Sequence, residues 1–284
     1  MNKLFLGPAE VAAFTSQVGV NKTSMNKLKA FVLAIFAGAF IGFATLGSST
    51  AACGLLANGA TFGLGKLVQG FVFSVGLMLV LVAGAELFTG NCLILVGVLD
   101  KKVKTASMLA NWVLVWLGNL VGALLLTACI SKAGLLSGGG NMVGAISLKL
   151  ACAKCSMSFG AAVCSGILCN VLVCLAVWMS FAAQDVASKL FAAGFPIMLF
   201  VISGYEHSIA NMTYIPLGLV AKNSEAIVAK ALEIGVSQAA IDNLTWGSMF
   251  GKNLLPVTIG NIIGGACIVA LAYWFVYLSK KKDK

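Results

Sequence analysis

The sequence has no arginine, a single histidine and only nine acidic residues among 284. Charged residues make up 10% of the chain and hydrophobic residues 60%, and the mean hydropathy is +1.00. Soluble domains carry about 25% charged residues, and disordered chains are poorer still in apolar residues. The composition excludes both classes and indicates an integral membrane protein.

Other absences narrow the function. None of the four prolines follows an asparagine, so the paired Asn-Pro-Ala signature of aquaporin-type pores is missing. With one histidine, no aspartate in an apolar segment and no G-x-S-x-G motif, an intramembrane enzyme has few residues to use. The Cys152-x-x-Cys155 pair has no second pair and no nearby histidine, so we interpret the nine cysteines as small apolar residues. We expect no enzyme activity, no metal and no cofactor.

The net charge of +10 comes entirely from lysine, mostly in short connecting segments and at the termini. This placement favours a topology signal over a nucleic-acid surface. Twelve of the 19 lysines fall on one predicted side: Lys3, Lys22, Lys27, Lys29, Lys101, Lys102, Lys104, Lys189, Lys280, Lys281, Lys282 and Lys284. The positive-inside rule therefore predicts a multi-pass protein of the inner or plasma membrane with both termini in the cytoplasm.

Runs of about 20 or more apolar residues predict an all-α integral membrane fold with six transmembrane segments. They lie near 28–48, 66–99, 106–130, 157–183, 188–220 and 248–278. Residues 1–27 precede this channel domain (28–279), and 280–284 form a basic tail. Pro8 begins a short predicted interfacial helix that places Val11, Phe14 and Val18 on one face.

The second and fifth segments are too long for one straight crossing, since about 34 helical residues rise about 50 Å against a hydrocarbon core of about 30 Å. Each contains the pattern G-x-E-x4-N, at Gly84–Asn91 and again 120 residues later at Gly204–Asn211. The third and sixth segments share a second repeated pattern, in which Asn111 and Asn119 of the third correspond to Asn253 and Asn261 of the sixth. We therefore predict broken helices 2 and 5 and two inverted three-helix repeats, about 28–130 and 157–278.

Polar residues at these breaks need a reason to lie at membrane depth. For Glu86 and Glu206 we favour a structural role, in which the carboxylate holds the break open through Asn91 or Asn211, over direct substrate contact. His207 lies in one break opposite Thr89 of the other, and imidazole changes charge near physiological pH. A histidine there suits a small weak-acid anion, so we favour a functional role.

The residues alone leave two further questions open. Lys154, in the polar stretch before the fourth segment, is either a solvated loop lysine or a fixed charge that concentrates anions at the outer mouth. The apolar residues Phe73, Leu77, Leu87, Phe88, Val173 and Phe200 are packing residues or rings of a pore at two levels.

At the breaks the sequence resembles the formate/nitrite transporter family, and formate channels most closely. The similarity covers nearly the whole chain, in AELFTGN (85–91), ANWVLVWLGNLVGALL (110–125), GILCNVLVCLAVWMS (166–180), SGYEHSIANM (203–212), IPLGL (215–219) and NLLPVTIGNIIGG (253–265). The resemblance implies an aquaporin-like fold of six tilted helices, with one pore per protomer and five protomers around a lipid-plugged axis.

The resemblance also implies roles for single residues. His207 matches the central pore histidine and Thr89 the threonine that faces it, while Lys154 matches the vestibule lysine and Asn170 the asparagine of the fourth span. Glu206 and Asn211 match the residues that orient the histidine. The inner constriction corresponds to Leu77, Leu87 and Phe88, and the outer one to Phe73, Val173 and Phe200. Gly90 and Asn91 depart from the usual residues after the threonine.

We therefore expect a channel or transporter for small monovalent anions, most closely matched to formate, with a His–Thr site and proton coupling as a further possibility of the chemistry. Nitrite or hydrosulfide is the alternative within the family. A neutral-solute pore of aquaporin type is the alternative of another class. The expected partners are the anion, the bilayer and four further copies of the chain, with no nucleic acid.

Overall fold

The computed structural model describes residues 5–279, and helices dominate this part of the chain. Six helical stretches are long and apolar enough to cross a membrane: Lys27–Ala57, Gly59–Gly84, Thr105–Lys132, Phe159–Ala182, Val186–Ser203 and Trp246–Tyr277. The prediction of an all-helical membrane fold with six such segments is confirmed. The first segment extends nine residues beyond the predicted end at 48, and the second starts seven residues before 66.

The first half of the chain contains α1 (Pro8–Ser24), α2 (Lys27–Ala57), η1 (Gly59–Thr61), α3 (Phe62–Phe73), α4 (Val75–Leu79), η2 (Val80–Gly84), α5 (Phe88–Asn91), α6 (Ile94–Leu99) and α7 (Thr105–Lys132). After η3 (Leu135–Ser137) follow α8 (Met142–Cys155), α9 (Phe159–Ala182), α10 (Val186–Ser203), α11 (Ser208–Ala221), α12 (Glu225–Glu233), α13 (Gln238–Asp242), α14 (Trp246–Ser248), η4 (Met249–Leu254), α15 (Leu255–Ile262), η5 (Ile263–Ala270) and α16 (Leu271–Tyr277).

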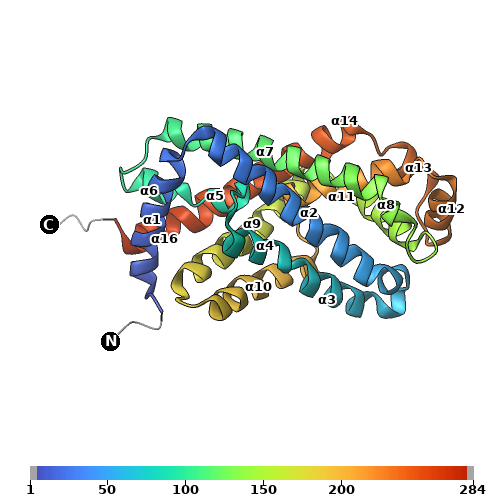
Figure 1. Ribbon diagram of the computed structural model, residues 1–284, viewed down its shortest axis with the longest axis horizontal. Helices are drawn as coiled ribbons and strands as arrows, with labels where there is room; N and C mark the ends of the chain where they lie inside the picture. Colours follow the sequence, from blue (N-terminus) through green and yellow to red (C-terminus); the bar gives the residue numbers. More distant parts are fainter. Residues whose placement is uncertain (1–4, 280–284) are drawn as a thin grey trace.

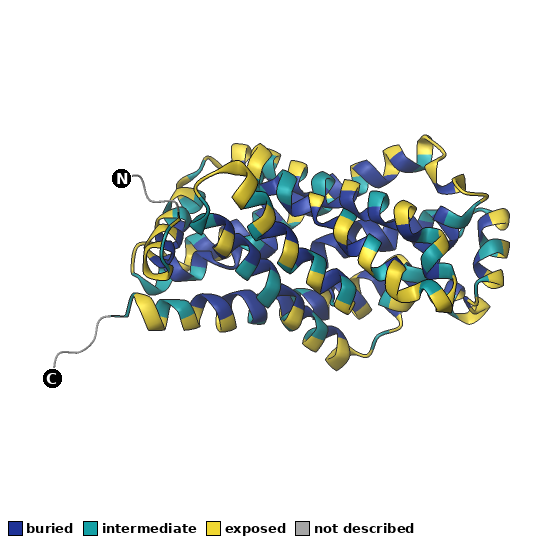
Figure 2. Cartoon of the chain, turned by 90° about the horizontal axis from the view of Figure 1, so that it is seen from below, coloured by how far each residue is buried: buried dark blue, intermediate teal, exposed yellow. Residues whose placement is uncertain are grey.

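The long helices run along the longest axis of the molecule (Figure 1). Helices α1, α6 and α16 gather at one end of this axis, and α8, α12 and α13 at the other. We call these the α1 end and the α8 end. Buried residues follow the middle of the bundle, while exposed positions lie on the outside (Figure 2). Large apolar side chains such as Phe71, Phe191 and Phe275 are among the exposed ones, as a surface in contact with lipid or other apolar partners requires.

Both predicted breaks are present. The helix formed by α3, α4 and the π-helical turn η2 stops at Gly84, and α5 restarts at Phe88. Likewise α10 stops before Gly204, and α11 restarts at Ser208. Gly84 (φ 87°) and Gly204 (φ 76°) adopt left-handed backbone conformations at the two stops, which glycine accepts without a Cβ clash.

Of the two alternatives left open for Lys154, the solvated loop lysine is excluded, because the stretch around Lys154 belongs to helix α8. Helix α1 continues to Ser24, and its buried positions are Val11, Ala12, Thr15, Ser16 and Gly19. Small residues, which allow close approach, face α6, where Gly97 lies near the Ser16 carbonyl, while Phe14 is exposed. The interfacial position of this helix stays a prediction.

Glycines allow the long helices to touch backbone to backbone. A Cβ at Gly122 of α7 would clash with the Ile35 carbonyl oxygen of α2. In the second half, a Cβ at Gly264 would clash in the same way with the Ile167 carbonyl oxygen of α9. Such close approach is how membrane helices associate, because lipid removes the hydrophobic drive between them.

Replacing Gly122 by alanine is expected to lower the free energy of unfolding by about 2 kcal/mol or more, because the added methyl meets a main-chain carbonyl that cannot rotate away. The matched control is Gly54→Ala in α2, where an added Cβ meets no atom within 4 Å. Thermal unfolding of both variants in detergent measures the difference. Equal melting temperatures would show that the α2 and α7 backbones are not in this contact.

Candidate functional site

Asn119 of α7 holds the first break. Its side-chain nitrogen donates to the carbonyl oxygens of Ala34 (2.8 Å) and Glu86 (2.9 Å), and its side-chain oxygen accepts from the Phe88 N–H (3.0 Å). The carboxamide therefore satisfies one backbone group on α2 and two at the break, where a helix ladder is interrupted.

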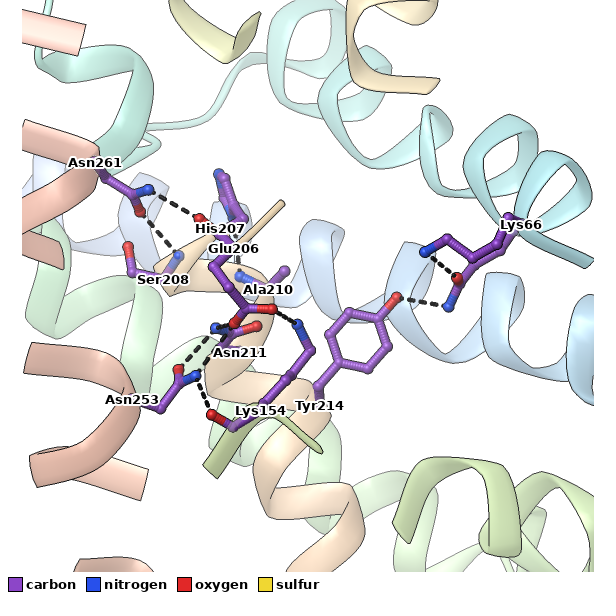
Figure 3. Close-up of polar contacts among 11 residues, drawn as sticks. Lys66, Lys154, Glu206, His207, Ser208, Ala210, Asn211, Tyr214, Asn253 and Asn261 are labelled. Carbon is purple, nitrogen blue, oxygen red and sulfur yellow. Dashed lines mark hydrogen bonds and ion pairs between the residues drawn. The ribbon is translucent and has the colours of Figure 1, made fainter. Parts of the chain in front are cut away.

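Asn261 of α15 does the same at the second break. It donates to the carbonyl oxygens of Gly166 (2.9 Å) and Glu206 (3.0 Å) and accepts from the Ser208 N–H (2.9 Å) (Figure 3). Asn119 and Asn261 are both 0% exposed. The two halves of the chain thus close their breaks with the same contacts.

Glu206 lies at the centre of a buried polar cluster at the second break. Its carboxylate pairs with the Lys154 ammonium (2.8 Å) and accepts from Asn211 (2.6 Å) and Asn253 (3.2 Å). Asn211 also donates to the side-chain oxygen of Asn253 (2.7 Å), and the side-chain nitrogen of Asn253 donates to the Lys154 carbonyl (3.0 Å). These bonds occupy both carboxylate oxygens with partners of the protein itself.

The first break carries the same cluster with Lys22 in place of Lys154. Glu86 pairs with Lys22 (2.7 Å) and accepts from Asn91 (2.8 Å), and Asn91 donates to Asn111 (2.9 Å). The sequence pattern indicates only a topology signal for Lys22. Its spacing from Lys154 equals that of Ala34 from Gly166, so the internal repeat extends to this lysine.

Thr89 and His207 meet between the two breaks. The Thr89 hydroxyl lies 2.9 Å from Nε2 of His207, and the two residues are 0% and 3% exposed. Nδ1 of His207 accepts the Ala210 N–H (3.0 Å), which makes His207 the N-cap of α11. Because Nδ1 accepts, the proton of the neutral ring is on Nε2, aimed at the threonine oxygen. The sequence-based pairing of these two residues agrees with this geometry.

Two cavities approach this pair from opposite ends. The α8 vestibule, about 310 Å³, is lined by Lys154, Glu206, His207, Phe73 and Phe200 among others. The α1 vestibule, about 530 Å³, is lined by residues that include Lys22, Glu86, Leu77, Leu87 and Asn91. Each vestibule therefore has a lysine–glutamate pair in its wall and apolar side chains toward the centre.

Aromatic rings close the α8 vestibule next to the histidine. Phe73 and Phe200 meet edge to face with ring centroids 5.7 Å apart, and Phe200 stacks on the His207 ring at 5.9 Å. Phe88 packs edge to face against Trp112 at 6.3 Å and is not among the described residues that line either vestibule. A solute passing between the vestibules has to leave most of its water at these side chains.

Two residues predicted for the site lie behind it. Asn170 donates to the carbonyl oxygens of Thr89 (3.2 Å) and Asn261 (2.6 Å), and Cys174 adds a thiol 3.4 Å from the Thr89 carbonyl. Asn170 therefore positions the threonine. Val173 is 1% exposed and is not among the described residues that line either vestibule.

A buried polar pair between two water-accessible vestibules in a six-span helical bundle defines a membrane transport protein for small solutes. The sequence assigns it more narrowly. A family model for formate/nitrite transporters matches residues 9–275, and the chain belongs to that family. Its members and the homologues named below are channels and transporters, not enzymes.

The relatives are similar over nearly their full length. The formate channel FocA of Escherichia coli K12 is 41% identical over 95% of this chain and 94% of its own. A probable formate transporter of Methanothermobacter thermautotrophicus is 37% identical over 99% of this chain and 100% of its own.

Two solved structures have a fold similar to that of this chain. A pentameric formate channel with formate bound superposes with a TM-score of 0.78, at 34% identity, over 89% of this chain and 98% of that one. A second structure, an FNT family ion channel, superposes with a TM-score of 0.77, at 29% identity, over 94% of this chain and 98% of that one.

Asn261→Asp is expected to lower the free energy of unfolding by about 3 kcal/mol, since it removes both donors and points a carboxylate at the carbonyls of Gly166 and Glu206. Asn223→Asp, the same change at an exposed position after α11, is the control. Melting temperatures in detergent compare the two. If Asn261→Asp has the same melting temperature as the control, the Asn261 carboxamide does not hold the break.

Proposed function

We propose that the protein conducts small monovalent anions across the membrane, with formate as the principal substrate, through a pore in each protomer of a homopentamer. The Thr89–His207 pair, buried between two vestibules, is the observation that carries this proposal. The relatives described above are formate channels and a probable formate transporter, which supports formate over nitrite and hydrosulfide. The lysine distribution favours cytoplasmic termini, which makes the α1 end the inner one.

The geometry suggests how an anion passes. At the rings of Phe73 and Phe200 it loses water, a step that is costly unless polar groups replace the lost hydrogen bonds. The replacements are the Thr89 hydroxyl and the Nε2–H of His207, which now bond to each other. A carboxylate inserted between them accepts from both, so the resting bond marks the binding position.

Proton coupling is the second part of the proposal. A second proton on His207 has to go to Nδ1, which then gives up the Ala210 N–H. Loss of such an N-cap costs about 1 kcal/mol, and a bound anion compensates that cost by pairing with the imidazolium. Transfer of the Nε2 proton to the anion then releases the neutral acid and leaves the neutral ring with its proton on Nδ1. The ring returns to its resting tautomer when Nε2 takes up a proton from solvent and Nδ1 gives its proton to solvent, after which Nδ1 again accepts from Ala210.

Flux into proteoliposomes tests the substrate. Formate, nitrite, hydrosulfide, lactate and glycerol are compared between about pH 5 and pH 8, the range in which an ordinary histidine titrates. The proposal expects formate to move fastest. Fastest flux of nitrite or hydrosulfide selects the other substrates of the family, and flux of glycerol alone supports a neutral-solute pore and refutes the anion assignment.

His207→Asn is expected to lower formate flux at neutral pH at least about tenfold, equivalent to 1.4 kcal/mol at the barrier, and to flatten its pH dependence. Asparagine still accepts the Ala210 N–H as an N-cap, so folding is preserved while the imidazole is lost. Thr89→Ser, which keeps the hydroxyl, serves as the control and retains the pH profile. A His207→Asn protein that assembles and keeps the wild-type pH profile would exclude proton exchange at His207.

A further inference from the structure

The two vestibules differ in charge. In each, the lysine at the break is already paired, Lys22 with Glu86 at 2.7 Å and Lys154 with Glu206 at 2.8 Å, so each pair is neutral overall. The α8 vestibule has a second lysine in its lining, Lys66 of α3. None of the ion pairs among residues 5–279 includes Lys66. The positive charge of the α8 vestibule that no carboxylate pairs with is therefore on Lys66, and the described lining of the α1 vestibule has no such second cation.

Neutral groups surround this ammonium. Its hydrogen-bond acceptor among the described residues is the side-chain oxygen of Gln69, at 3.4 Å. The Gln69 amide nitrogen donates in turn to the Tyr214 hydroxyl at 3.5 Å. Tyr214 lies between Lys66 and the Lys154–Glu206 pair (Figure 3). Both bonds are long, so the ammonium and the amide can turn toward a ligand without breaking a strong bond.

Lys66 also lies where two cavities meet. A further cavity of about 320 Å³ between α2, α3 and α8 shares Lys66, Gln69, Leu150 and Ala153 with the α8 vestibule. Lys149 lines this second cavity and donates to the Ile234 carbonyl at 3.2 Å. Lys66 therefore lines both cavities, whereas Lys149 lines the side cavity alone.

The spacing along α3 and α4 continues the path inward. Lys66, Gln69, Phe73 and Leu77 follow one another at helical intervals of three or four residues, so they occupy one face of the helix. Lys66 and Gln69 line the vestibule, Phe73 closes it, and Leu77 lines the opposite vestibule. One helix face therefore presents a cation, an amide and two apolar barriers in the order in which an entering anion would meet them.

We propose that Lys66 and Gln69 form a docking subsite for a small monovalent carboxylate or oxoanion at the α8 end, ahead of the Phe73–Phe200 rings. The ammonium binds the charge and the amide nitrogen donates a second hydrogen bond. This proposal rests on the proposed anion conduction. In it, Lys66 captures the anion at the α8 end, and the main role of Lys154 is to fix Glu206. Because the α1 vestibule has no equivalent, capture is stronger from the α8 end.

The test is Lys66→Gln in the full-length protein, with labelled formate as the probe and flux measured separately from each face in right-side-out and inside-out vesicles. The apparent KM from the α8 face is expected to rise about five- to tenfold, the lower end of electrostatic steering effects, with maximal flux retained. The KM from the α1 face stays within about twofold. Raising the salt concentration weakens wild-type capture from the α8 face and affects the variant less.

Two variants complete the experiment. Lys132→Gln removes the same charge from an exposed position at the C-terminal end of α7, outside both vestibules, and is expected to behave as wild type. Lys66→Arg keeps the charge, so its KM from the α8 face is expected to lie close to the wild-type value. Melting temperature and assembly state are compared for all variants.

An unchanged KM in Lys66→Gln, an equal rise from both faces, or a fall in maximal flux with KM constant would each overturn the subsite. Those results differ from failure of the proposed function, in which the wild-type protein itself carries no formate from either face.

Discussion

The structure depends on one constraint: a backbone interrupted at membrane depth must have every freed N–H and C=O bonded inside the protein. Asn119 and Asn261 meet it, each bonding one group of a neighbouring helix and two groups of a break. Once the breaks are fixed, α5 and α11 begin at the middle of the bundle. Thr89 and His207, at these starts, are brought within 2.9 Å of each other. The candidate site is a consequence of how the breaks are satisfied.

The charged side chains lie in the walls of the vestibules, and the donors at the centre are neutral. A buried carboxylate is costly unless it is paired and hydrogen-bonded, and a buried ion pair adds little net stability. Glu86 and Glu206 have both oxygens occupied by lysine and asparagine, so they fix the walls of the vestibules, and the charge of each carboxylate is offset by its lysine. The donors that remain for a solute at the centre are neutral, the Thr89 hydroxyl and the His207 N–H. In the proposed function, a centre that is neutral until His207 takes up a second proton binds an anion without holding it too tightly to leave.

Local sequence patterns predicted the six segments, both breaks and the residues at them, because length, glycine and buried polar residues are read along the chain. What they missed depends on contacts between distant segments. Lys22 becomes part of a site only when α1 packs beside the first break, and Asn170 lies behind Thr89 because its amide reaches a carbonyl on another helix. Nothing in the local sequence marks Lys66, because it belongs to a vestibule only where the fold brings residues of α3 and α8 to the walls of the same cavity. The inverted sense of the repeats stays a prediction.

The two halves of the chain carry different residues at a few corresponding positions, and these positions are the most informative about function. By the spacing of the break motifs, Leu87 is the counterpart of His207 and Ile209 the counterpart of Thr89, so each half supplies one polar and one apolar residue at the centre. The hydroxyl of one half can therefore bond the imidazole of the other. A symmetric centre with two histidines would place two titratable rings together, and one with two leucines would offer no donor. The residues around the two breaks follow the repeat because both breaks leave backbone N–H and C=O groups that need partners. The centre and Lys66 depart from it, as the proposed binding of one anion by one donor pair and the proposed stronger capture from the α8 end require.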